Sequence, residues 1–371
     1  MYEIIDKYAF VWHNVHGFKP IKFKGENPMK KFLSIALVIA LAVSVIALVG
    51  CGNKPAATLK FGMGVVSSLG DAKNAEGETN GSGKFTTTAV AVLLDADNKI
   101  VAIDLDCADI GAAWTSEGKV VATENFATKY ELGADYNMAA YGTKHDGSEG
   151  AVKEWFEQAD AFMATATGKT LDEVKAMMGE DTYAIGDLAT AGCTISVGEF
   201  VAALEKAVAN AADSTATAEN KLSLAIVSSA SNKDAAEDAE GSVEISSTVV
   251  AAATDAEGKV VVSKTDAVSG KVTFDVKGVA TVDTKAEIKT KLEIGADYNM
   301  AAYGSKHDGS EGAVKEWFEQ AAAFDAALVG KTAADFAALA DAEGYGTGDL
   351  ATAGCTIHIS DMIAAAEKAV K

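Results

Sequence analysis

The sequence contains no arginine, and its 371 residues carry a formal net charge of −21. Nucleic-acid binding generally requires a basic surface, and arginine is the preferred side chain for two-point contacts with phosphates and bases. We therefore expect no nucleic-acid partner. An acidic surface favours solubility and is repelled by anionic lipid headgroups, so a membrane-attached form should hold its folded part away from the bilayer.

Several catalytic and metal-binding patterns are also missing. The sequence has no Cys-x-x-Cys or His-x-x-x-His spacing, which argues against a structural zinc site. It has no glycine-rich phosphate loop of the nucleotide-binding folds. Cys193 and His145 could be imagined as nucleophile and base, but nothing in the sequence places them together. We predict no catalytic residue and no metal site, and a stand-alone hydrolase is the least favoured class of function.

One long apolar run stands near the start of the chain. It covers residues 32–49, follows Met29-Lys30-Lys31, and ends at Leu48-Val49-Gly50-Cys51. A basic start, an apolar stretch and small residues before a cut are typical of a secretion signal. The Leu-Val-Gly-Cys tetrad looks like a lipobox, in which the cysteine thiol receives a diacylglycerol before cleavage makes that cysteine the first residue.

The lipobox sets the expected location. We predict a lipoprotein signal peptide at 29–50, lipidation of Cys51 and a tether at 51–57. Two acyl chains, palmitate for example, hold a protein on a bilayer where one chain would be marginal. Membrane lipid is thus the first expected partner, and the chain should sit at the cell surface, on the extracytoplasmic face of the cell membrane.

Residues 1–28 do not fit this scheme, because a signal sequence begins near its basic pair. Residues 24–26 are encoded AAR-GGN-GAR, which can contain a ribosome-binding AGGAG just ahead of Met29. We therefore expect 1–28 to be an upstream misassignment of the start codon. A genuine cytoplasmic extension is the alternative.

A long segment of the sequence occurs twice. Residues 133–158 recur at 295–320 with one change, Thr143 against Ser305, and 187–194 recur unchanged at 349–356. A period near 160 residues is that of a whole domain and not of a solenoid repeat. We predict two tandem copies of one domain, at 58–208 and 221–371, joined by a small, polar linker at 209–220.

The cysteines follow the repeat. Cys193 and Cys355 occupy matching places in the two predicted copies, so a disulfide between them is not expected. With Cys107 they form an odd number beside the lipidated Cys51. Small buried thiols are the favoured interpretation of all three.

Each copy is predicted to be an α+β domain. β-Branched residues and polar turns predict an antiparallel sheet with strands at 58–67, 85–94 and 100–105 in the first copy and at 221–229, 243–253 and 260–264 in the second. A further hairpin is expected around 114–123 and 272–282. Helical spacing follows at 152–163, and a capping box opens a short helix at Thr170. A strand at 194–197 then leads into a C-terminal amphipathic helix, and the order of strands before helices is typical of α+β folds.

Two groups of side chains are weaker candidates for a site. His145 and His307 lie in the loop Lys-His-Asp-Gly-Ser-Glu, where a surface turn is favoured over a metal ligand and the spacing is not that of a calcium-binding EF loop. Tyr136, Met138 and Tyr141 could line a pocket for a ring, but core packing is the favoured interpretation.

A series of motifs that occurs in both copies resembles a known protein family. Each copy has a hairpin with Lys-Ile-Val or Lys-Val-Val on its third strand, then Gly-Lys-Thr, then Asp-Leu-Ala-Thr-Ala-Gly-Cys-Thr-Ile and an alanine-rich helix. This order resembles the FMN-binding domains of bacterial membrane electron-transfer complexes and of extracellular electron-transfer lipoproteins. In that family an aspartate precedes Ser-Gly-Ala-Thr, and a separate flavin transferase joins the final threonine to FMN through a phosphoester.

The resemblance implies specific residues. Thr194 and Thr356 would be the FMN attachment points, and Asp187 and Asp349 the acids that the transferase recognises. This sequence departs from the family by reading Ala-Gly-Cys-Thr and by placing the aspartate one residue further from the threonine. A hydroxyl that leads into a helix start can hold a phosphate against unpaired backbone N–H groups. The alternative is an unmodified turn in which threonine serves strand propensity.

These implications set the expected function. The chain would be an FMN-carrying extracytoplasmic electron-transfer lipoprotein, in which flavin does the redox chemistry. A flavin transferase and a membrane electron donor would be its partners. The alternative is a surface lipoprotein that binds a small solute or another protein and does no redox chemistry.

Overall fold

The computed structural model describes residues 57–141, 152–303 and 314–371. The predictions for residues 1–56, Cys51 among them, and for His145 and His307 fall outside the described residues. Ala56–Lys371 form one unit by their contacts. Below, the first half means residues 57–208 and the second half residues 221–371.

An antiparallel sheet opens the first half. Its main strands are β1 (Lys60–Leu69), β2 (Gly81–Leu94) and β3 (Ile100–Trp114). Two short strands, β4 (Val120–Val121) and β5 (Ala212–Asp213), extend it to the order β4-β3-β2-β1-β5. The turn between β2 and β3 is closed by Asn98, which adopts a left-handed φ of 59° that asparagine tolerates well. Because β4 pairs with the end of β3, the hairpin predicted around 114–123 is confirmed.

The second half also begins with an antiparallel sheet. Its sheet has the order β6-β7-β8, with strands β6 (Lys221–Lys233), β7 (Gly241–Thr254) and β8 (Val260–Phe274), all antiparallel. Both third strands run about ten residues past the ends predicted at 105 and 264. These extra residues pair with β2 and β7 to the ends of the strands.

Helices follow the sheet in each half. In the first half they are α3 (Lys129–Leu132), η2 (Gly133–Tyr136), α4 (Met138–Tyr141), α5 (Trp155–Ala166), α6 (Leu171–Lys175), α7 (Gly186–Ala191) and α8 (Gly198–Ala209). In the second half they are α9 (Lys291–Ile294), η3 (Gly295–Tyr298), α10 (Met300–Tyr303), α11 (Trp317–Leu328), α12 (Ala333–Phe336), η4 (Ala337–Leu339), α13 (Gly348–Thr352) and α14 (Ser360–Ala369). The predicted capping box at Thr170 is confirmed, since its side chain accepts the Glu173 N–H and Glu173 accepts the Thr170 N–H. The structure is therefore a mixed α+β fold with antiparallel sheets, as expected.

The strand predicted at 194–197 is wrong. These residues form a loop, and within it Ser196 makes one isolated bridge to Tyr183. The Val197 N–H bonds to the Thr182 carbonyl at 2.9 Å, and the Thr194 N–H bonds to a side chain. The backbone donors are therefore used locally and do not join a sheet.

The segment predicted as a linker lies against the first sheet. β5 pairs with the start of β1, and the Leu59 N–H donates to the Ala216 carbonyl at 2.8 Å. Ala216 is fully buried. The connection between the halves is thus held in place by backbone hydrogen bonds.

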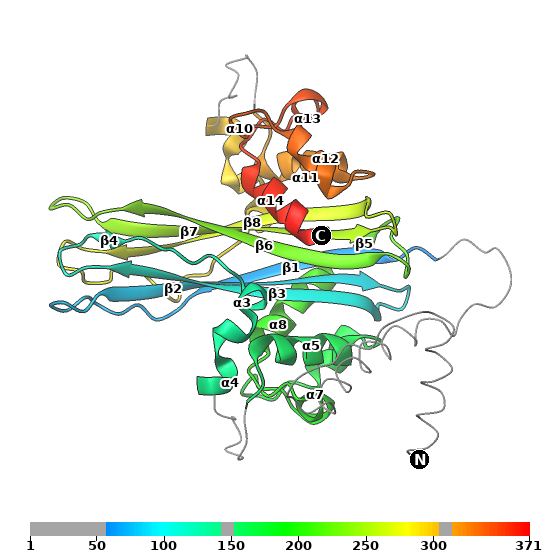
Figure 1. The fold of residues 1–371 in the computed structure, drawn as a ribbon, viewed down its shortest axis with the longest axis horizontal. Coiled ribbons are helices and arrows are strands. Elements are labelled where there is room, and N and C mark those ends of the chain that lie inside the picture. Colours follow the sequence, from blue (N-terminus) through cyan, green and yellow to red (C-terminus); the bar gives the residue numbers. More distant parts are fainter. Residues whose placement is uncertain (1–56, 142–151, 304–313) are drawn as a thin grey trace, which may run out of the picture. The chain divides into compact units, whose positions relative to one another are not determined.

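Helices cover one face of each sheet (Figure 1). In the first half α8 crosses β1 and β2, and buried residues of α5, α7 and α8 pack against Val90, Val92 and Leu105. Phe200, Val201 and Leu204 of α8 are buried, which fits the predicted amphipathic helix. The second half has a matching cluster beneath α11, α12 and α14.

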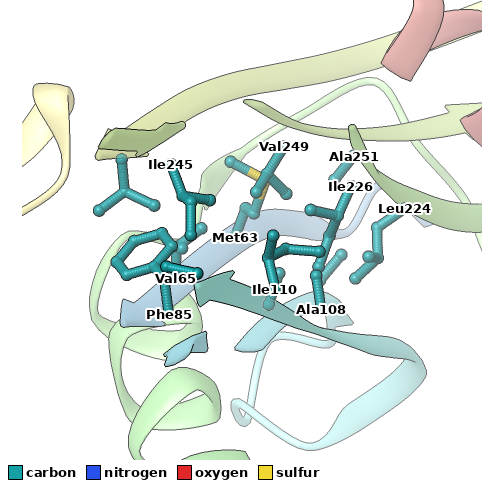
Figure 2. Packing of buried hydrophobic residues seen from close by; sticks show 14 of the residues in the cluster. Met63, Val65, Phe85, Ala108, Ile110, Leu224, Ile226, Ile245, Val249 and Ala251 are labelled. Atoms are coloured by element: carbon teal, nitrogen blue, oxygen red, sulfur yellow. The ribbon is translucent and has the colours of Figure 1, made fainter. Parts of the chain in front are cut away.

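The other faces of the two sheets pack against each other. Figure 2 shows Met63, Val65, Phe85 and Ile110 of the first sheet pointing toward Ile226, Ile245 and Val249 of the second. The order of layers is therefore helices, sheet, sheet, helices (Figure 1). This central layer brings residues that lie about 160 positions apart in the sequence into direct contact, as the Thr87 hydroxyl shows by donating to that of Ser247 at 3.2 Å.

Many contacts between the halves occur as matched pairs. The Ala75 N–H donates to the Gly278 carbonyl at 2.9 Å, and the Ala235 N–H donates to the Gly118 carbonyl at 2.8 Å. Two ion pairs correspond in the same way. Lys206 pairs with Glu293 at 2.5 Å, and Lys368 pairs with Glu131 at 2.7 Å. Trp114 stacks on Phe274 with ring centroids 4.8 Å apart. Contacts that recur with the two sides exchanged are the pattern of a two-fold symmetric interface.

Candidate functional site

The motif Ala-Gly-Cys-Thr forms the end of a short helix in each half. Gly192 ends α7 with a φ of 99°, and the Cys193 N–H donates to the Leu188 carbonyl at 3.2 Å. This is the left-handed C-cap for which glycine is preferred. Gly354 has a φ of 97° at the corresponding place after α13. The glycine of the motif therefore has a structural role.

The cysteines of the motif are also structural. Cys107, Cys193 and Cys355 are buried and form no disulfide with one another, which confirms the prediction of small buried thiols. Burial raises the pKa of the Cys193 and Cys355 thiols to about 11 and that of Cys107 to about 12. These thiols stay protonated at neutral pH, which argues against Cys193 as a nucleophile.

Each candidate threonine is held by a buried glutamine. The Thr194 N–H donates to Oε1 of Gln158 at 2.8 Å, and its hydroxyl donates to the same oxygen at 3.3 Å. The Gln158 side chain is fixed in turn, because its Nε2 donates to the Lys153 carbonyl at 2.9 Å. In the second half the Thr356 N–H donates to Oε1 of Gln320 at 2.8 Å. Both threonines are half-buried.

The ammonium group of a lysine from another segment contacts each of these turns. Nζ of Lys153 donates to the Ala191 carbonyl at 3.3 Å, and Nζ of Lys315 donates to the Ala353 carbonyl at 2.8 Å. A side chain at Gly192 or Gly354 would collide with these lysines. No sequence pattern indicates this contact, because Lys153 and Ala191 lie on segments 38 residues apart. Its consequence is a positive charge beside each Gly-Cys-Thr turn.

The structure does not bring the candidate aspartates to the threonines. Asp187 and Asp349 are exposed in the first turns of α7 and α13, where a negative charge is favoured by the helix dipole. Thr194 and Thr356 follow the opposite ends of those helices. A pocket of about 440 Å³ includes Asp349 in its lining but not Thr356. The helix start at Gly198 also lies four residues beyond Thr194.

Of the predicted group Tyr136, Met138 and Tyr141, the two described side chains lie in the layer between the helices and the sheet. Tyr136 and Met138 are half-buried members of that cluster, which confirms the core-packing interpretation for these two residues. Sδ of Met138 contacts Nε2 of Gln158 at 3.4 Å, so Met138 also borders the Thr194 support. The Tyr141 side chain falls outside the described residues.

An ion pair that the sequence did not indicate lies near this group. Nζ of Lys129 is 3.1 Å from a carboxylate oxygen of Asp109, and it lies over the rings of Tyr136 and Trp155. Burial alone would raise the pKa of Asp109, but Lys129 and Lys84 outweigh it and the pKa is lowered. The second half keeps Lys291 over Tyr298 and Trp317 but has serine at position 269, which corresponds to Asp109.

A pocket of about 430 Å³ opens where the two halves meet, and we call it the junction pocket. Its lining combines α8 of the first half with β8, α9 and η3 of the second half and Phe318. Polar and charged side chains reach it beside an apolar wall: Lys206, Asn210, Lys264, Asp266, Thr290 and Glu293. Sequence analysis missed this site because its residues come from distant segments.

Asp266 in this lining predicts a pH effect on stability. Burial raises its pKa from 3.8 to about 6, although the Thr290 hydroxyl and two backbone N–H groups oppose the shift. A raised pKa means that the folded state holds the proton more tightly, so this contribution to stability is complete below about pH 4 and is lost as the pH rises through 6.

Asp266→Asn removes this titration while its amide oxygen can still accept the Ala267 and Leu292 N–H groups. Relative to the wild type, the variant should gain about 2 kcal/mol of stability between pH 4 and pH 8. Urea unfolding of both proteins at the two pH values measures the difference. A difference that stays constant with pH would show that Asp266 does not titrate in this way.

Residues 57–141, 152–303 and 314–371 offer neither a metal site nor a membrane-spanning helix. They contain no cluster of three histidine, cysteine or acidic side chains that could hold a metal ion. No helix within them has both the length and the apolar character needed to cross a bilayer. Comparison with known proteins found no matching family model, no matching curated protein and no matching solved structure.

Proposed function

We propose that this chain is a lipid-anchored extracytoplasmic protein that carries FMN on Thr194 and Thr356 and transfers electrons. The observation that carries the proposal is the matched setting of the two threonines. Each follows a glycine-capped turn, is fixed through its N–H by a fully buried glutamine, and has a lysine ammonium on the same turn. A threonine whose backbone is fixed, with a lysine ammonium bound to the same turn, suits a phosphate ester.

The attachment step defines what each residue does. The threonine hydroxyl oxygen would bond to the flavin-side phosphorus of a flavin dinucleotide, the pyrophosphate P–O bond would break, and AMP would leave while the hydroxyl proton passes to a base of the transferase. Gln158 or Gln320 would orient the threonine, and Lys153 or Lys315 would offset the charge of the phosphodiester. Asp187 and Asp349 are exposed and accessible to a transferase. Bound flavin would supply the electron chemistry.

We also propose that the halves are two copies of one domain, 58–208 and 221–371, paired as a fused dimer around 209–220. The support is the set of contacts that recur with the halves exchanged, such as Lys206 with Glu293 and Lys368 with Glu131. This arrangement gives one threonine site per copy. Lipidation of Cys51 after removal of a signal peptide at 29–50 would hold the pair at the membrane, near an electron donor.

The test uses protein extracted from the membranes of cells that contain a flavin transferase. After denaturation in acid, we expect yellow protein that keeps flavin fluorescence on a denaturing gel, with two flavins per chain. Protein made without the transferase is the control and should be colourless. If the protein is colourless in both preparations, the flavin proposal is wrong.

A second candidate is a surface lipoprotein that binds a small solute without redox chemistry. The observation that favours it is the junction pocket, whose volume of about 430 Å³ falls within the range of small-ligand sites. Colourless protein that binds a solute there would support this candidate.

A further inference from the structure

Residues that line the junction pocket have corresponding positions in the first half, and two of these positions differ in chemistry. Tyr130 in α3 corresponds to Leu292 in α9. Their backbones are placed alike, since the Tyr130 N–H donates to Asp106 at 3.4 Å and the Leu292 N–H donates to Asp266 at 3.2 Å. The two positions differ in the side chain that they carry.

The phenol of Tyr130 is anchored inside the first half. Its hydroxyl donates to Asp160 at 2.6 Å, and its ring packs edge-on against Trp155 at a centroid distance of 5.4 Å. The second half has Leu292 and alanine at position 322 in the corresponding places. The second half therefore has no phenol ring beside the junction pocket, which Leu292 lines.

The charge beside this space is reversed. In the first half Asp104 accepts the Leu224 N–H at 2.7 Å. The corresponding residue of β8 is Lys264, which lines the junction pocket. Lys264 is half-buried, and its ammonium group makes no hydrogen bond or ion pair with any other residue that the structure describes. Asp325 exerts an electrostatic effect on it, but the oxygens of Asp325 already accept hydrogen bonds from Thr265 and Ser263.

Lys206 and Glu293 neutralise each other, and the Asp266 carboxylate accepts the Ala267 and Leu292 N–H groups. Lys206 pairs with Glu293 at 2.5 Å and also donates to the Val65 carbonyl at 3.1 Å. Nδ2 of Asn210 donates to the Met63 carbonyl at 3.3 Å, which leaves the amide oxygen of Asn210 as an acceptor. Lys264 is thus the lining cation that can meet a new anion, beside an apolar wall that includes Phe318.

We propose that the junction pocket binds a small aromatic acid. The ring lies against Leu292, Val65 and Phe318, and the carboxylate pairs with Lys264. An apolar pocket with a few placed polar groups is the usual form of a small-molecule site, and a carboxylate next to a half-buried lysine forms a charge-assisted contact. This site does not depend on flavin at the threonines.

The test is calorimetric titration of the detergent-solubilised full chain with 4-hydroxybenzoate. We expect saturable binding at one site per chain. Lys264→Gln should weaken it at least tenfold, because the carboxylate loses its partner. Leu292→Tyr should abolish it by filling the pocket with a phenol ring. The neutral amide, 4-hydroxybenzamide, should bind at least tenfold more weakly than the acid.

Matched controls separate binding from folding. Tyr130→Leu alters the first half, where Asp104 remains, and should leave the affinity for 4-hydroxybenzoate unchanged. Urea unfolding should show that the Lys264→Gln variant stays as stable as the wild type. Absence of binding to the wild type, or wild-type affinity in the Lys264→Gln or the Leu292→Tyr variant, would overturn the proposal. Neither outcome bears on covalent flavin, which is read by colour after denaturation.

Discussion

Replacing Gly64 by alanine is expected to lower the free energy of unfolding by about 3 kcal/mol. β1 lies so close to α8 that a Cβ atom at Gly64 would overlap the Ala203 carbonyl oxygen and the Ala207 backbone nitrogen. Backbone atoms of a helix cannot move aside as a flexible side chain can, so strand and helix must separate. Urea unfolding measures the loss.

Gly111→Ala is the matched control for this prediction. Gly111 lies in β3 of the same sheet, and nothing is within 4 Å of the position its Cβ would take. Alanine there should leave stability unchanged or raise it by about 0.5 kcal/mol, because glycine loses more conformational freedom on folding. Equal stabilities of the Gly64→Ala and Gly111→Ala variants would contradict the close approach of β1 to α8.

The second large effect is expected at the threonines. Thr194→Val and Thr356→Val should each halve the covalent flavin per chain, and the double variant should carry none, because valine has the shape of threonine without the hydroxyl. The N–H groups that bind Gln158 and Gln320 remain, so the fold should persist. Flavin absorbance per denatured chain gives the count.

Thr190→Val and Thr352→Val are the controls for the flavin count. Their hydroxyls donate to the Gly186 and Gly348 carbonyls within the same short helices. These variants should keep the full flavin content. Full flavin content in the Thr194→Val, Thr356→Val double variant would place any attachment elsewhere.

Local sequence patterns predicted the helices and strands better than they predicted which residues contact one another. The helical spacing at 152–163 corresponds to α5, and the capping box at Thr170 opens α6. The strand predicted at 194–197 failed because β-branched residues there signalled extended backbone, whereas a buried glutamine takes the Thr194 N–H. A side chain from a distant helix is not visible in a local pattern.

The two central strands do not show the alternation of buried and exposed residues that is typical of a strand with one exposed face. β2 is buried without interruption from Phe85 to Leu94, and β7 from Ser247 to Thr254. An uninterrupted run indicates a strand covered on both faces, here by helices on one side and by the other sheet on the other. The sequence alone does not say which second layer covers it.

The junction pocket depends on differences between the halves. The exchange of Tyr130 for Leu292 and of Asp104 for Lys264 marks positions where the halves diverge. In the sequence these changes look like scattered surface substitutions. They gather at one place only when β8 and α9 fold against α8 of the other half.

The most direct test of the anchored flavin carrier is the intact mass of the mature protein, extracted from membranes of cells that make a flavin transferase. We predict a chain that begins at Cys51 and carries a diacylglycerol on that residue together with two FMN groups, each adding the mass of FMN less one water. A chain that lacks both the acyl groups and the flavin would contradict the account.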